Sequence, residues 1–135
     1  MSQVAIRAAL ESALDAITPA ISTAWENVAF EPPAASTPYQ RAFILFAEPE
    51  DPEAGNAVSI ERGIFQINLL YPLKKGDAVA RARAELIRTA FYRGRSLTSA
   101  GIVVSVEKTP EAGQGTVDGD RWLIPVKVRF TAQIT

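Results

Sequence analysis

The chain has 135 residues, of which 47% are hydrophobic, 14 are Lys or Arg and 15 are Asp or Glu, so its formal net charge is −1. This length predicts one domain, residues 1–135, and the near-neutral charge argues against nucleic-acid binding by bulk electrostatics. Cysteine and histidine are both absent, which excludes disulfides, thiolate metal sites, and the commonest general base and metal ligand. We therefore expect no cofactor, no bound metal and no catalytic residues.

The N-terminal segment has apolar residues at three- and four-residue steps between Val4 and Ile17, which predicts an amphipathic helix over Gln3 to Ile17. Its interspersed charges argue against a secretory signal, and no apolar run approaches the ~20 residues that span a bilayer, so no membrane partner is expected. Four of the nine prolines lie between Pro19 and Pro38. This stretch is predicted to be an ordered, extended connection, because proline interrupts helices and central strands.

Two aromatic and β-branched stretches, Tyr39–Ala47 and Val58–Pro72, predict the strands of an antiparallel hairpin. The connection between them, EPEDPEAGNA, carries four carboxylates: Glu48, Glu50, Asp51 and Glu53. It lacks the alternating ligands and turn glycine of a calcium loop. We interpret it as a solvated or partner-facing loop.

A second helix is predicted after Gly76, with Asp77 as its cap and a stop signal at Gly94. Its expected apolar stripe is Val79, Ala82, Leu86, Ala90 and Phe91, widened by Ala80 and Ile87. Residues 101–108 predict a third strand. Residues 121–134 predict a fourth, because Trp122 to Ile134 alternate apolar and mostly polar side chains. Pro125 within it favours an edge position or a bulge, since proline cannot donate to the ladder.

The predicted order is therefore helix, strand, strand, helix, strand, strand. It favours an α+β domain in which two helices pack on one face of a four-stranded, largely antiparallel sheet. The segment GQGTVDGD before the last strand is rich in glycine, yet it follows a proline and opens a strand, so it does not predict a phosphate-binding loop. Two interpretations stay open: a plain surface loop, or a mobile loop that orders against another subunit.

Half of the basic residues are concentrated between positions 74 and 95: Lys74, Lys75, Arg81, Arg83, Arg88, Arg93 and Arg95. One interpretation is a solvated helix face, on which Glu85 pairs with a neighbouring arginine. The other is a subunit contact between Lys74, Lys75, Arg81 and Arg88 on one chain and Glu48, Glu50, Asp51 and Glu53 on the next. If these two patches are far apart in space, such a contact is head-to-tail, and a head-to-tail contact that closes makes a ring.

Three stretches of the chain resemble the tail-terminator (tail-completion) proteins of long-tailed bacteriophages and their prophage relatives. The first is the stretch after the first helix, with Asn27, Phe30, Pro32 and Tyr39. The second is a strand, turn and helix, with Gly63, Phe65, Gln66, Ile67, Pro72, Gly76, Ala82, Ala90 and Phe91. The third is the close of the chain, with Trp122, Pro125 and Val126. Together they cover most of the sequence.

The resemblance implies a helix-and-sheet protomer that assembles with itself into a hexameric ring. Such a ring caps the tail tube, stops polymerisation of the tail-tube protein and offers the surface to which head–tail connector proteins dock. DNA passes through such a ring, and no specific nucleic-acid binding is implied. The protein would be a virion tail component made in the bacterial host cytoplasm, and it would not be an enzyme.

Three alternatives are kept. The nearest is a head–tail connector or neck ring subunit. The others are a nucleic-acid-binding module that uses the basic helix, and a small carboxylate-dependent hydrolase. The first of these two predicts affinity that falls steeply with salt, and the second requires carboxylates that converge in one pocket.

Overall fold

The computed structural model describes residues 2–51 and 58–134, with two helices and eight strands. The helices are α1 (Ser2–Asp15) and α2 (Ala78–Ala90). The first strands are β1 (Ser22–Trp25), β2 (Tyr39–Phe46) and β3 (Ser59–Pro72). The later strands are β4 (Ser96–Ser99), β5 (Ile102–Val106), β6 (Glu111–Ala112), β7 (Thr116–Asp118) and β8 (Arg121–Ile134).

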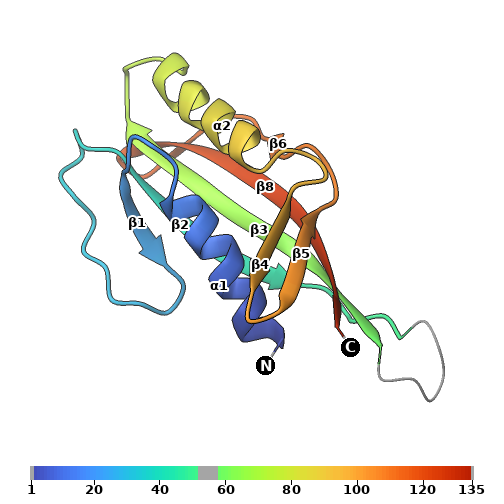
Figure 1. Ribbon diagram of the computed structural model, residues 1–135. Coiled ribbons are helices and arrows are strands. Elements are labelled where there is room, and N and C mark those ends of the chain that lie inside the picture. The colour runs from blue at the N-terminus through green and yellow to red at the C-terminus, as the bar shows by residue number, and fades with distance from the viewer. Residues whose placement is uncertain (1, 52–57, 135) are drawn as a thin grey trace.

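All eight strands belong to one mixed, curled sheet, which forms a half-barrel. Its order is β1-β2-β3-β8-β5-β4, and β6 and β7 also pair with β8. Strand β1 is parallel to β2, whereas the other pairs are antiparallel. The two 14-residue strands β3 and β8 pair along their whole length, from Ser59 opposite Ile134 to Pro72 opposite Arg121. They form the long axis of the molecule (Figure 1).

The core lies between the inner face of the sheet and the two helices, which are on the same side of it (Figure 1). Alternation along β3 and β8 places Phe65, Ile67, Val128 and Phe130 on that face, and all four are fully buried. Helix α1 packs on β4 and β5, while α2 packs on β3 and β8. Phe91, just after α2, lies edge-on to Phe65, with ring centroids 5.9 Å apart.

The predicted four-stranded, largely antiparallel sheet is wrong. The predicted hairpin and the long last strand are present, but β1, β4, β6 and β7 add to them, and β1 makes the sheet mixed. These four strands are two to four residues long. A segment so short carries little periodicity of its own, and its pairing is decided by the partner strand that it meets.

The predicted apolar stripe of the second helix is also shifted from the face that α2 buries. The buried residues are Ala80, Arg83, Ala84 and Ile87. Val79 is 64% exposed and Leu86 is 39% exposed. The stripe was misplaced because the buried face has an arginine at its centre, and a search for apolar spacing passes over a charged residue.

Gly63 lies where β3 passes close to its neighbours. A Cβ at this position would be 2.6 Å from the carbonyl oxygen of Leu45 and 2.8 Å from the ring of Phe130. The Phe130 ring itself meets Phe46 edge-on, with centroids 6.0 Å apart. Glycine is therefore required by the closeness of both the Leu45 carbonyl and the Phe130 ring, and the constraint is steric rather than conformational.

The glycine-rich segment before β8 is folded back onto that strand. The amide of Gly113 donates to the carbonyl of Pro125 at 2.8 Å, and a Cβ on Gly115 would lie 2.3 Å from the indole of Trp122. Pro125 falls between the β6 and β7 pairings, so its missing N–H interrupts no ladder on that side. This strand is not at an edge of the sheet, because β3 pairs with its other side.

Neither helix in the described residues is long and apolar enough to cross a membrane.

Candidate functional site

The arginines of α2 bind backbone carbonyls of distant loops. Arg81 bonds to the carboxylate of Asp77 at 3.0 Å and to the carbonyl oxygen of Gly113 at 3.0 Å. Arg88 donates to the carbonyl oxygen of Pro110 at 3.1 Å and lies 3.7 Å from Glu85. Both arginines thus hold the segment that precedes β7 against the helix.

Arg83 is the buried member of this group. It is 4% exposed, donates through one terminal nitrogen to the carbonyl oxygen of Pro19, and has no hydrogen bond at Nε within the described chain. Burial lowers the pKa of its guanidinium, and burial raises the pKa of the nearby Tyr71 hydroxyl. Arg83 ties the connection that follows α1 to α2, so it is neither on a solvated face nor available to a partner.

Arg95, beyond the helix, donates to the carbonyl oxygen of Ala90 at 2.5 Å. Lys74, Lys75 and Arg93 are exposed, and none of the three forms an ion pair with any described residue. The basic block therefore divides into arginines that fix loops and exposed cations. Lys74 and Lys75 are the members of the predicted contact that are fully available to another molecule.

Asp77 was predicted to cap α2 through its side chain. It occupies the cap position, but its carboxylate makes no capping hydrogen bond. Instead the Trp122 indole donates to Oδ1 at 2.8 Å, and Arg81 bonds to Oδ2. The hydrogen bond from Trp122, followed by that from Arg81, lowers the pKa of the Asp77 carboxyl.

We predict that Asp77→Asn flattens the dependence of stability on pH in acid. A carboxyl whose pKa is lowered by folding stabilises the fold above its unfolded pKa, about 3.9, and loses that contribution as the pH falls through the folded value. Urea unfolding between pH 2.5 and 7 measures the effect. Asp15→Asn, at an exposed position, is the matched control. An unchanged slope in Asp77→Asn would show that Trp122 and Arg81 do not act on this carboxylate.

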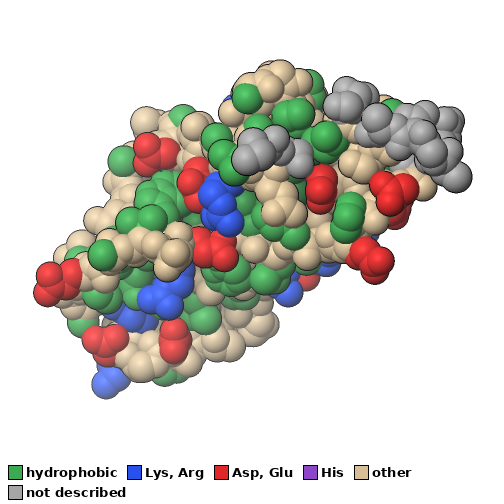
Figure 2. Space-filling view, turned by 90° about the horizontal axis from the view of Figure 1, so that it is seen from below, with side chains coloured by type: hydrophobic (Ala, Val, Ile, Leu, Met, Phe, Trp, Pro, Cys, Tyr) green, Lys and Arg blue, Asp and Glu red, His purple; other side chains and the backbone are tan. Residues whose placement is uncertain are grey.

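Three of the four carboxylates of the predicted acidic loop lie within the described residues. They are Glu48, Glu50 and Asp51, and all three are exposed. Glu53 lies outside the described residues. Glu50 exchanges two backbone hydrogen bonds with Ile60, of 2.9 and 2.7 Å, and its carboxylate pairs with Arg62 at 2.9 Å. The segment is therefore held beside the start of β3. In Figure 2, acidic side chains are spread over the face shown, from its left-hand end to its right-hand end.

These acidic residues do not meet the basic ones within a chain. Glu50 pairs with the start of β3, whereas Lys74 and Lys75 follow its end. Figure 1 shows the two ends of β3 at opposite ends of the molecule. The distance along the strand from Ile60 to Pro72 is about 40 Å, at roughly 3.3 Å per residue. The acidic and basic patches are therefore far apart in space, so a contact between them on neighbouring subunits would be head-to-tail.

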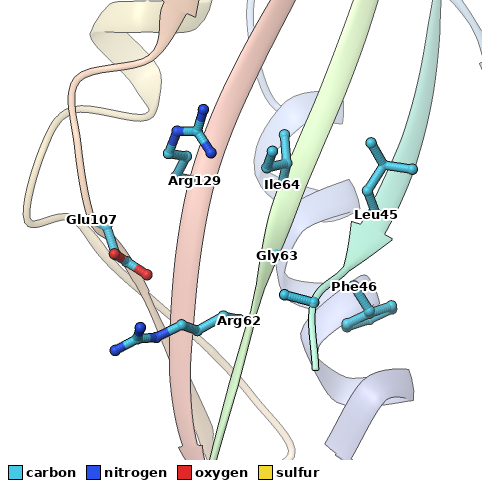
Figure 3. Close-up of a pocket in the computed structure, with 8 residues that line it drawn as sticks. Leu45, Phe46, Arg62, Gly63, Ile64, Glu107 and Arg129 are labelled. Carbon is cyan, nitrogen blue, oxygen red and sulfur yellow. The ribbon is translucent and has the colours of Figure 1, made fainter. Parts of the chain in front are cut away.

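Both described helices cover the inner face of the sheet, and the outer face carries a shallow pocket of about 400 Å³. Figure 3 shows it where β2, β3 and β8 lie side by side, with Leu45 and Ile64 from two of these strands and Arg129 from the third. Arg62 lies at its lower side and Glu107 at its left-hand side in this view. Leu45 is 50% exposed. The pocket mixes apolar and charged groups.

Among the described residues, no three carboxylates gather closely enough to hold a metal ion. The carboxylates that a hydrolase would use are instead spread along an exposed segment and across separate loops.

Arg121 holds the proline-rich segment in place, and the sequence analysis did not single it out. It is 4% exposed and donates to the carbonyl oxygens of Thr37, Pro33 and Ala34 at 2.5, 2.7 and 2.9 Å. Its guanidinium also lies over the Tyr39 ring, 4.8 Å from the centroid. The available signal was the proline-rich segment itself, whose carbonyls lie outside any ladder and need donors from elsewhere.

Comparisons with known proteins agree with this architecture. The family model described as "Phage tail terminator protein" matches residues 5–130. One solved structure is similar over 100% of this chain and 98% of its own, with a TM-score of 0.82 and 32% sequence identity. No curated protein matches. The family match confirms the resemblance predicted from the sequence, and it covers nearly the whole domain. The chain belongs to the phage tail terminator protein family.

Proposed function

We propose that this protein forms a ring of six subunits that caps the finished tail tube. The ring docks on the last layer of tube subunits and buries the surface on which the tube would grow. Its opposite surface differs, so no further tube subunit can add, and head–tail connector proteins dock there instead. The mechanism is steric and interfacial.

Family membership supports the coarser part of this function. Tail terminators are structural proteins of phage tail assembly, so the chain is a component of the virion tail. The six-fold ring and the docking of the head go beyond the family match and belong to the proposal.

The observation that carries the ring is the separation of the two charged segments. Lys74 and Lys75 lie at one end of β3, and Glu48, Glu50 and Asp51 lie at the other. Complementary surfaces at opposite ends of one subunit can pair only between copies. Repeating that heterologous contact around an axis closes a ring. Arg81 and Arg88 stand beside the basic end, but they already hold Gly113 and Pro110, so the lysines are the better test of the contact.

The experiment is negative-stain microscopy of the purified protein, alone and mixed with tail tubes. We expect rings of about the tube's width, and plugs at tube ends. Replacing both Lys74 and Lys75 with glutamate should abolish the rings, and adding Glu48→Lys should partly restore them. The matched control is Lys108→Glu, another exposed lysine.

A wild-type chain that stays monomeric at high concentration, equally at low and moderate salt, would overturn the ring. Rings that bind head protein but not tube protein would favour a connector subunit. Raising the salt concentration should dissociate the rings, because exposed charge pairs weaken as salt rises.

A further inference from the structure

A pocket of about 400 Å³ lies beneath the Lys74–Lys75 turn, between the end of β3 and the start of α2. Its walls include Pro38, Tyr71, Pro72 and Val79. Lys75 is the single charged residue among the described residues that line it. Val79 is 64% exposed, although it is apolar and lies in the first turn of the helix. The pocket thus offers apolar, proline- and tyrosine-lined walls with positive charge at the rim.

The opposite end of the molecule carries a segment of matching chemistry. Glu48, Pro49 and Glu50 are all exposed, outside any named strand. The two backbone hydrogen bonds between Glu50 and Ile60, and the ion pair with Arg62, fix the end of this segment in place. A segment that is already held loses less conformational entropy when it binds. It presents a proline between two carboxylates.

We propose that Pro49 of one subunit inserts into this pocket on the next subunit. Extended proline segments dock in grooves lined by aromatic side chains, because the proline ring is rigid and apolar and costs little entropy to order. Glu48 then faces Lys74 and Lys75, which sets the orientation of the contact. The proposal rests on the proposed ring, and it names the side chains that join neighbouring subunits. The occupant is a second copy, because about 40 Å of β3 separates Pro49 from the pocket within one chain.

The absence of cysteine makes a direct test possible. A chain carrying both Pro49→Cys and Val79→Cys is treated with a short bismaleimide. Within one chain the two thiols are too far apart to be bridged. Between neighbouring subunits they are in contact, so we expect a ladder of covalent multimers on a denaturing gel. Either single variant should give dimers at most. Pro49→Cys combined with Val28→Cys, at another exposed apolar position, is the matched control and should give no ladder.

A second variant tests the pocket without crosslinking. Val79→Asp places a carboxylate where Glu48 and Glu50 of the neighbour would approach, and the exposure of Val79 means that the protomer keeps its thermal unfolding temperature. We expect the protein concentration at half-assembly to rise about tenfold or more, which corresponds to about 1.4 kcal/mol. Val28→Asp should leave it unchanged.

The outcomes separate this contact from the proposed function. Rings or capped tubes formed by the wild-type chain, with no ladder from the cysteine pair and no effect of Val79→Asp, would overturn the contact and leave the function standing. A ladder from a chain that fails to cap tubes would support the contact and overturn the capping role. A monomeric wild type without a ladder would overturn both.

Discussion

We expect Arg121→Ala to lower the free energy of unfolding by about 3 kcal/mol or more. The substitution removes the donor for three carbonyl oxygens of the proline-rich segment and leaves them without that partner. A hydrogen bond to a charged donor contributes about 1.5–3 kcal/mol to stability, and Arg121 makes three of them. It also removes the cation that lies over Tyr39. The effect should be concentrated in residues 33–37, because that segment loses its main attachment to the sheet.

Urea unfolding and limited proteolysis measure the two consequences of this change separately. The midpoint of unfolding should fall, and cleavage between Pro33 and Thr37 should become faster. Arg121→Lys keeps the charge but loses the planar fork that reaches several carbonyls, so it should lie between wild type and alanine. Arg93→Ala, an exposed arginine, is the matched control. Wild-type stability in Arg121→Ala would show that the carbonyls are satisfied by water after the arginine is gone.

We expect Phe130→Ala to cost about 3–5 kcal/mol of stability, the range for truncating a buried phenylalanine. Phe130 is fully buried, meets Phe46 edge-on and fills the space above Gly63. The same geometry predicts that Gly63→Ala alone costs about 1–3 kcal/mol by overpacking.

The two sites should be coupled. Removing the ring removes the contacts at 2.8 and 3.0 Å and leaves the one of 2.6 Å with the Leu45 carbonyl, so Gly63→Ala should cost less in the Phe130→Ala background. A double-mutant cycle in urea gives the coupling energy. Leu45→Ala, on the exposed outer face, serves as the control for a hydrophobic truncation outside the core. Strictly additive changes would show that the backbone contact, and not the ring, makes glycine necessary.

Long periodic segments were predictable from the sequence because their own pattern determines them. Strand β8 alternates over 14 residues, and its predicted bounds, Arg121 to Ile134, are those observed. The hairpin of β2 and β3 was predicted for the same reason and was confirmed. Strand β1 could not be predicted in this way. Its four residues are held by pairing with Tyr39 to Ala42, a partner separated from it by the proline-rich connection.

The candidate site was less predictable, because the hydrogen-bond partners of a side chain depend on the tertiary structure. The sequence places Arg81, Arg83 and Arg88 on a helix, but it does not indicate that their partners are carbonyls of Gly113, Pro19 and Pro110. The predicted contact between the acidic segment and Lys74 and Lys75 stays a prediction. The structure adds that the acidic segment and the two lysines lie at opposite ends of β3.

The arginine bonds to loop carbonyls give the protomer and its assembly different sensitivities to the solvent. Each of these bonds joins a guanidinium to a neutral carbonyl oxygen, so it does not depend on a pair of opposite charges. These partly buried bonds are also poorly screened by salt. The proposed contact between subunits is the opposite case, because it joins exposed lysines to exposed carboxylates. Moderate salt would therefore separate the subunits while each one keeps its loops in place, so disassembly would yield intact protomers ready to reassemble.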